Sequence, residues 1–263
     1  MNFVEIEYKE RDAEWAMSKL QSHDYYELYL LIDGKREFFF EDKVFSLTAP
    51  TFSVIPPFTM HKTTGGSYKR VNVNISAELL SERERAFLDK LASGIAFALS
   101  KEDALSLSSL LAKGSEIMLA DNQEKHSLTL SFVHAALYIL ESCKLESLDY
   151  NEDTKGKRSD TAALEVVAYI NEHYRESLTL ENISERFYMS KNTLCSKFRS
   201  AMHCSVMEYL SFVRINRAKE LLATTDMGME EISELCGYSS ANYFSLTFKR
   251  SVGISPSGYR QAK

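Results

Sequence analysis

The sequence predicts a multidomain α+β protein, with an antiparallel β-barrel and flanking helices before an all-α carboxy-terminal domain. Two observations carry this prediction. Short strand-like runs separated by Pro and Gly occupy residues 23–75, whereas helical periodicity dominates the rest of the chain. Residues 178–259 then contain one helix-turn-helix pattern written twice. A chain of 263 residues is long enough for two domains with separate cores.

The expected strands are aromatic and aliphatic runs between turn residues. They lie at residues 25–32, 36–40, 44–47, 51–55 and 68–75. Asp33-Gly34 predicts a hairpin turn between the first two strands, because this dipeptide favours the positive φ angles of tight turns. Side chains alternate between the two faces of a strand. One face of the first strand is therefore expected to carry a polar and aromatic set: Gln21, His23, Tyr25, Glu27 and Tyr29.

Three helical segments follow the strands, near residues 78–92, 102–120 and 127–143. The third carries an apolar stripe formed by Leu130, Val133, Leu137 and Leu140, with Ala136 alongside. Few apolar residues occur in the stretch after it, which is typical of a solvated linker. The predicted divisions are a barrel at 1–76, a helical segment packed on it at 77–148, a linker at 149–160 and a helical domain at 161–263.

The repeated pattern pairs Ile183 with Ile232 and Phe198 with Phe248, at offsets of 49 and 50 residues. Ser190 and Ser240 precede the second helix of each copy, where a hydroxyl can accept a hydrogen bond from the first turn. Both second helices are apolar on one face and small-polar or basic on the other. Between the copies, residues 206–222 form a helical strut of roughly 25 Å, which suits two recognition helices about one DNA turn apart.

A helix with such an outer face suits the major groove of DNA, which presents hydrogen-bond donors and acceptors on the base edges. Side chains that position the protein on phosphates read no sequence by themselves. The candidate base contacts are Asn192, Thr193, Ser196, Asn242 and Tyr243. The candidate phosphate contacts are Lys191, Lys197, Arg199, Lys249 and Arg250.

Several separate blocks resemble the DNA-binding domain of the AraC/XylS transcription regulators. They are Tyr209-Leu-x3-Arg214-Ile-x2-Ala218-Lys-Glu-Leu-Leu222, Gly237-Tyr-Ser-Ser, and Phe248-Lys-Arg-x2-Gly253-Ile-Ser-Pro256-x2-Tyr-Arg260. The resemblance implies a seven-helix domain with two helix-turn-helix units. Family members commonly carry a guanine-reading Arg in each recognition helix, and Ser196 and Leu246 stand at those positions here. The resemblance also implies a homodimer held by residues 77–148, with promoter DNA and RNA polymerase as partners.

The segments His23-x3-Glu27-x6-Gly34 and Pro56-x4-His61 resemble the two signatures of the cupin barrel, which is the sensory half of many such regulators. The full metal-binding signature would have His and Gly where this chain has Gln21 and Phe58. The cluster is therefore open to three uses: effector contact, metal binding, or a hydrogen-bond network in the barrel. We expect effector contact, with no metal or other cofactor, through His23, Tyr25, Glu27, Tyr29 and His61.

Composition and charge are those of an ordinary soluble protein, with 44% hydrophobic and 26% charged residues. Residues 1–160 carry 19 basic and 26 acidic groups, whereas residues 161–263 carry 12 and 11. The four Cys lack C-x-x-C spacing, and the chain has no signal peptide and no membrane span. These features predict a cytoplasmic protein.

The sequence thus predicts a ligand-responsive, sequence-specific transcription regulator that is not an enzyme and that senses a carbohydrate or related metabolite. Two alternatives stay open. One is a metal-dependent cupin enzyme fused to a DNA-binding domain, and the other is a regulator whose barrel serves only for ligand-independent dimerisation. Ser–His–Asp, Walker and dinucleotide-binding signatures are all missing from the sequence.

Overall fold

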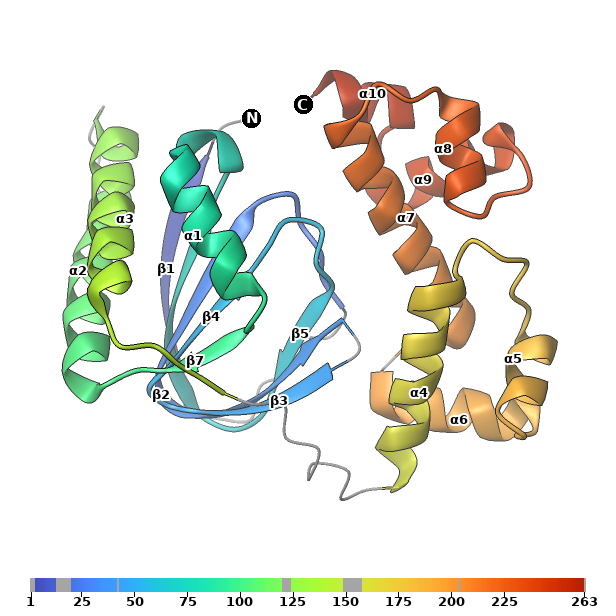
Figure 1. The fold of residues 1–263 in the computed structure, drawn as a ribbon, viewed down its shortest axis with the longest axis horizontal. Coiled ribbons are helices and arrows are strands. Elements are labelled where there is room, and N and C mark those ends of the chain that lie inside the picture. Colours follow the sequence, from blue (N-terminus) through green and yellow to red (C-terminus); the bar gives the residue numbers. More distant parts are fainter. Residues whose placement is uncertain are drawn as a thin grey trace. The chain divides into compact units, whose positions relative to one another are not determined.

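The computed structural model describes residues 3–12, 20–41, 43–119, 124–148, 158–202 and 204–262 (Figure 1). The chain forms two compact units, one comprising Met1–Phe40 and Val44–Asn151, the other Glu41–Lys43 and Glu152–Lys263. Most of the predicted linker, residues 149–157, lies outside the described residues. Within the described ranges, no helix has both the length and the apolar character needed to cross a membrane.

The first unit is built on an antiparallel sheet. Its strand order is β1 (Val4–Arg11), β6 (Tyr68–Ile75), β2 (Tyr26–Phe40), β4 (Thr51–Ile55), β7 (Ala96–Ala98) and β8 (Glu146–Ser147). Strands β3 (Lys43–Thr48) and β5 (His61–Thr64) pair with β2 outside this order. The long strand β2 therefore pairs with four other strands: β3, β4, β5 and β6.

The hairpin predicted at Asp33-Gly34 is wrong, because β2 continues through it. The register of β2 against β6 shifts between Leu31 and Asp33, and Gly34 then pairs with Tyr68. Gly34 has φ +95°, and a Cβ there would lie 2.2 Å from the carbonyl oxygen of Ser67. The glycine thus allows a bulge and a close approach of two backbones instead of a chain reversal. Beyond the bulge, the second half of β2 pairs with β5.

The two faces of the sheet have different environments. Leu28 and Leu30 belong to the core beneath the helices, and Tyr29 and Leu31 belong to a second core on the opposite face. The helices are α1 (Glu82–Ala92), α2 (Lys101–Leu119) and α3 (Lys125–Ser142), preceded by the short 3-10 helix η1 (Ala77–Leu79). Figure 1 shows α2 and α3 side by side against the sheet.

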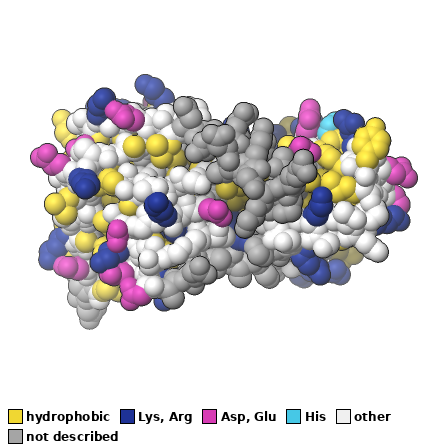
Figure 2. All heavy atoms as spheres, turned by 90° about the horizontal axis from the view of Figure 1, so that it is seen from below, with side chains coloured by type: hydrophobic (Ala, Val, Ile, Leu, Met, Phe, Trp, Pro, Cys, Tyr) yellow, Lys and Arg dark blue, Asp and Glu magenta, His cyan; other side chains and the backbone are white. Residues whose placement is uncertain are grey.

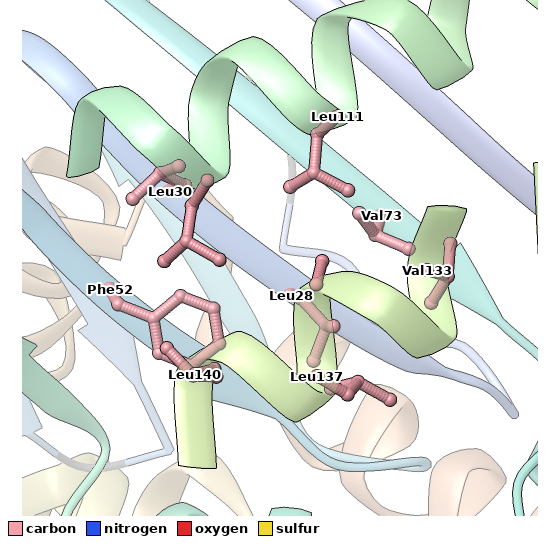
Figure 3. Close-up of a pocket in the computed structure, with 10 residues that line it drawn as sticks. Leu28, Leu30, Phe52, Val73, Leu111, Val133, Leu137 and Leu140 are labelled. Carbon is pink, nitrogen blue, oxygen red and sulfur yellow. The ribbon is translucent and has the colours of Figure 1, made fainter. Parts of the chain in front are cut away.

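The predicted stripe on α3 packs against its own sheet. Val133, Ala136, Leu137 and Leu140 are buried in the helix-side core, and Leu130 is partly buried against it. A cavity of about 20 Å³ lies between these residues and the sheet, lined entirely by apolar side chains (Figure 3). That space is about the size of one water molecule and offers no polar partner. It is therefore unsuited to a hydroxyl-rich ligand.

The described part of the second unit contains seven helices, as the family resemblance implies. They are α4 (Arg158–His173), α5 (Leu180–Arg186), α6 (Lys191–Met202), α7 (Val206–Thr224), α8 (Met229–Leu235), α9 (Ala241–Val252) and α10 (Pro256–Gln261). Both predicted serine caps are confirmed, since Ser190 Oγ accepts from Thr193 N at 3.1 Å and Ser240 Oγ from Tyr243 N at 3.3 Å. The strut predicted between the copies is α7.

The tight turns of the two copies use different residues at one position. Tyr188 in the first copy has φ +52°, and Gly237, 49 residues later, has φ +74°. A Cβ at Gly237 would lie 2.6 Å from the carbonyl oxygen of Tyr174. Arg214 holds that same carbonyl with its Nε at 2.8 Å, which ties α7 to the loop after α4.

Candidate functional sites

A buried cluster lies where β2 begins and β5 starts. His23 Nε2 lies 3.0 Å from Glu27 Oε2, and His61 Nε2 lies 3.3 Å from the same oxygen. The His61 nitrogen is within ion-pair range, although its direction does not make a hydrogen bond. The ligand atoms of these three side chains lie within 4.8 Å of one another. Two segments that are distant in sequence therefore bring together the predicted imidazoles and carboxylate.

In both imidazoles, a backbone carbonyl next to Nδ1 determines that this nitrogen carries a proton. His23 Nδ1 lies 2.8 Å from Tyr25 O, and His61 Nδ1 lies 3.2 Å from Thr59 O. A carbonyl oxygen only accepts, so both Nδ1 atoms carry a proton. Each Nε2 then faces Glu27 either as a protonated donor of an imidazolium or as a lone pair.

Glu27 is only 7% exposed, yet it is held in its ionised form. Burial favours the neutral acid, but the hydrogen bond of His23 and the adjacent His61 imidazole outweigh it and lower the pKa of Glu27. The second oxygen, Oε1, accepts a hydrogen bond from Asn72 Nδ2. The cluster thus presents a fixed carboxylate beside two oriented rings.

Tyr25 and Tyr29, the two predicted aromatic contacts, take different places. The Tyr25 ring stacks on His23, with centroids 3.9 Å apart and planes 3° apart. Burial and the nearby charge of Glu27 raise the pKa of Tyr25 to about 12. Gln21 does not join them, because its side chain is exposed while its backbone pairs with His61. The predicted alternation fails there because β2 starts only at Tyr26.

Tyr29 belongs to a row of buried polar groups across three strands. It pairs with Asn72 on β6 and with Ser53 on β4. Within the described part of the chain, Asn72 Oδ1 and Ser53 Oγ are buried without a hydrogen-bond partner, and the buried Tyr29 hydroxyl lies beside the Arg36 guanidinium. Each buried unpaired group costs about 1–3 kcal/mol. The row therefore provides hydrogen-bonding groups for a polar ligand.

Arg70 lies on the same face of β6, two residues from Asn72. Its guanidinium carbon is 5.4 Å from the centre of the Tyr29 ring, and Nη2 donates to Glu7 at 3.3 Å. Sequence reasoning missed Arg70, Asn72 and Ser53. The signal was present, since polar residues at 70, 72 and 74 alternate with buried Val71, Val73 and Ile75.

The candidate recognition helices expose their predicted base-contact residues. On α6, Asn192, Thr193 and Ser196 are exposed, and on α9, Asn242 and Tyr243 are exposed. On the opposite faces, Leu194 and Phe198 of α6 and Phe244 and Phe248 of α9 are almost completely buried. Each helix is therefore anchored by its apolar face, which fixes the side that it presents to solvent.

The candidate phosphate contacts differ in their freedom. Arg199, Lys249 and Arg250 are exposed, whereas Lys197 is partly buried. Lys191 forms an ion pair with Glu181 of α5. A phosphate contact by Lys191 therefore requires it to leave this carboxylate.

Over the sheet unit, Figure 2 shows basic and acidic side chains interspersed on the visible face.

Comparisons with known proteins match both units. An AraC-like ligand binding domain model matches residues 3–82, and a helix-turn-helix domain model matches residues 183–262. The chain belongs to the AraC family. The two matches fall on the unit with the buried polar cluster and on the unit with the two candidate recognition helices.

Three curated relatives illustrate the similarity. The uncharacterized HTH-type transcriptional regulator YdiP of Escherichia coli K12 is 33% identical over 141 residues, which cover 53% of this chain and 46% of that protein. The transcriptional activator RhaS of Enterobacter sp. strain 638 is 27% identical over 146 residues, covering 54% and 50%. The melibiose operon regulatory protein of E. coli K12 is 30% identical over 97 residues, covering 37% and 32%. The chain thus spans half or less of the length of these relatives.

Two solved structures are similar to part of the chain. The C-terminal domain of AraT, a response regulator from Geobacillus stearothermophilus, is 31% identical and covers 41% of this chain and 89% of that one, with a TM-score of 0.39. The DNA-binding domain of AdpA in complex with a target DNA is 35% identical and covers 38% and 91%, with a TM-score of 0.37.

Proposed function

We propose that this protein is a ligand-responsive, sequence-specific DNA-binding transcription regulator and not an enzyme. The observation that carries the proposal is the pair of matched helix-turn-helix copies, whose second helices expose the same positions. Asn192, Thr193 and Ser196 on α6, with Asn242 and Tyr243 on α9, contact base edges. The exposed Lys and Arg side chains that flank them contact phosphates. A homodimer that recruits RNA polymerase is the working form.

The effector binds on the face of the sheet that carries Tyr29, opposite the helices. Tyr29, Ser53 and Asn72 offer buried hydroxyl and amide groups in one cross-strand row, and Glu27 lies beside them. A molecule with several hydroxyl groups can donate to the amide and carboxylate oxygens, accept from the hydroxyls and stack a ring face on tyrosine. A carbohydrate has this chemistry, and one relative is named for the melibiose operon.

Metal binding is a second candidate role for the His23, Glu27 and His61 cluster. When both rings are neutral, two imidazole lone pairs and one carboxylate oxygen converge, while each Nδ1–H donates to a carbonyl. This is the outer-shell pattern that orients histidines bound to metal, so the donor set fits a divalent transition metal. Metal analysis of the purified protein tests it. Stoichiometric metal that is lost in His61→Ala supports this role, and metal-free protein with full effector response excludes it.

The test of the proposed function is a mobility-shift assay with DNA from the promoter region beside the gene. Competitor DNA measures specificity, and a panel of sugars is added in turn. We expect a specific shift that one sugar alters. The double variant Tyr29→Phe, Ser53→Ala should keep the shift and lose the response, whereas Asn192→Ala should weaken the shift with the response intact. No specific shift in any fragment would refute the proposal.

A regulator whose barrel serves only dimerisation gives a different result. In that case the specific shift persists but no compound alters it, and no compound raises the melting temperature of the sheet unit. Since a ligand at a hundred times its Kd stabilises the folded state by about 2.7 kcal/mol, a thermal-shift screen detects even moderate binders.

A further inference from the structure

The outer faces of the two recognition helices differ in chemistry at equivalent positions. Asn192 of α6 corresponds to Asn242 of α9, so both helices carry an exposed amide at their second residue. The next outward positions carry hydroxyls in the first copy, at Thr193 and Ser196. The second copy carries the larger and more apolar Tyr243 and Leu246 there.

These two side chains of α9 are turned to solvent. Leu246 is 70% exposed and Tyr243 is 59% exposed, whereas Phe244 and Phe248 on the opposite face are fully buried. The Tyr243 ring also meets the Tyr238 ring edge-on, with centroids 6.0 Å apart, which supports its position. A lone exposed leucine is ordinary. Here it lies midway along α9, on the face opposite the buried Phe244 and Phe248.

Leu246 cannot donate or accept a hydrogen bond. Facing the edge of guanine or cytosine, it would exclude water from polar atoms and leave them unpaired. The apolar group that a base edge offers in the major groove is the C5 methyl of thymine. Exposed Lys249 and Arg250 stand one turn further along the helix, where their charge attracts the DNA backbone.

We propose that α9 reads thymine through its C5 methyl, with Leu246 as the specificity-determining residue and Tyr243 beside it, whereas α6 reads polar base edges. The operator is then asymmetric within each binding unit: the major groove that faces α9 carries a thymine at a defined position. This inference rests on the proposed DNA-binding function.

The test replaces single thymines by deoxyuridine, which lacks only the C5 methyl. The operator is first located by footprinting, and each substituted duplex is then titrated at one fixed salt concentration by fluorescence anisotropy. One deoxyuridine in the half facing α9 should weaken binding about fourfold, the effect of one buried methyl group. Deoxyuridine in the half facing α6 should have no such effect.

Variants assign the effect to one side chain. Leu246→Ala should bind the thymine and deoxyuridine duplexes equally, whereas the matched variant Ser196→Ala on α6 should retain the fourfold difference. Because Leu246 is exposed, its replacement leaves the core of the second copy intact, and an unchanged melting temperature checks this. Leu246→Arg should shift the preference at that position from thymine to guanine.

The outcomes separate the two proposals. Specific binding that is equally strong for every deoxyuridine duplex would overturn thymine reading and leave the regulator proposal standing. A methyl effect that persists in Leu246→Ala would also overturn the role of Leu246. Absence of specific binding to any operator would overturn the proposed function, and this inference with it.

Discussion

Replacing Gly237 by Ala should strongly destabilise the helix-turn-helix unit, whereas replacing Tyr188 by Gly should stabilise it. The two residues occupy the same turn position in the two copies, with φ +74° and +52°. The left-handed conformation costs a residue with a Cβ roughly 1–2 kcal/mol. Tyr188 already bears that cost, and Gly237 does not.

The surroundings decide the magnitudes. A Cβ at Gly237 would lie 2.6 Å from Tyr174 O and 2.8 Å from Arg175 O, both rigid backbone atoms. Overpacking of this kind costs about 1–3 kcal/mol, so Gly237→Ala should lose about 2–5 kcal/mol in total. Tyr188 is 95% exposed, so Tyr188→Gly removes no packing. Its relief of strain, less the entropy of glycine, should gain about 0.5–1 kcal/mol.

Urea unfolding followed by far-ultraviolet circular dichroism measures both changes in the full-length protein. The two units can unfold in separate transitions, so hydrogen exchange with mass spectrometry assigns the change to residues 174–240. A loss of less than about 0.5 kcal/mol in Gly237→Ala, or a destabilised Tyr188→Gly, would refute this turn geometry.

Other changes test separate parts of the protein. Asn192→Ala should relax specificity at one base pair of the operator by about 1–3 kcal/mol. Lys249→Ala should weaken binding to all DNA sequences alike and lower the slope of log K against log salt concentration by about one. Identical uniform losses in both variants would contradict this division of roles. Arg214→Ala removes the hydrogen bonds to the carbonyls of Tyr174 and Glu176. It should lower the free energy of unfolding in urea by about 2–3 kcal/mol. No change would show that solvent replaces the guanidinium. Burial raises the pKa of Cys236 to about 12, so at pH 8 a thiol reagent should modify it only after unfolding, with Cys236→Ser as the control; fast native labelling would refute its burial.

The helical unit could be predicted from sequence because its structure is local and repeated. The pairing of Ile183 with Ile232 and of Phe198 with Phe248 identified the core positions, and all four side chains are fully buried. Caps also act within a few residues, so Ser190 and Ser240 could be assigned without knowing the tertiary structure. The strained turn at Tyr188 was not predictable, because tyrosine gives no signal for a left-handed conformation.

The sheet unit was harder because its pairings join distant segments. Strand β1 was missed although Val4, Ile6 and Tyr8 alternate with Glu5 and Glu7 as in a half-buried strand, and β7 and β8 have only three and two residues. The period of two shows which residues share a face, but the register decides which side chains meet. Tyr29, Ser53 and Asn72 form one row only because β4 and β6 flank β2 in this register.

The charge of the second unit determines how much the proposed base contacts of α6 and α9 must contribute to DNA binding. Residues 161–263 carry 12 basic and 11 acidic groups, and Lys191 is already paired with Glu181. Attraction to phosphates is therefore modest, and it contributes equally to every DNA sequence. Specific binding must then depend more on close contacts of α6 and α9 with the base edges. Against so weak an electrostatic background, we expect the proposed contacts of Asn192 with a base edge and of Leu246 with a thymine methyl to make measurable contributions to specificity.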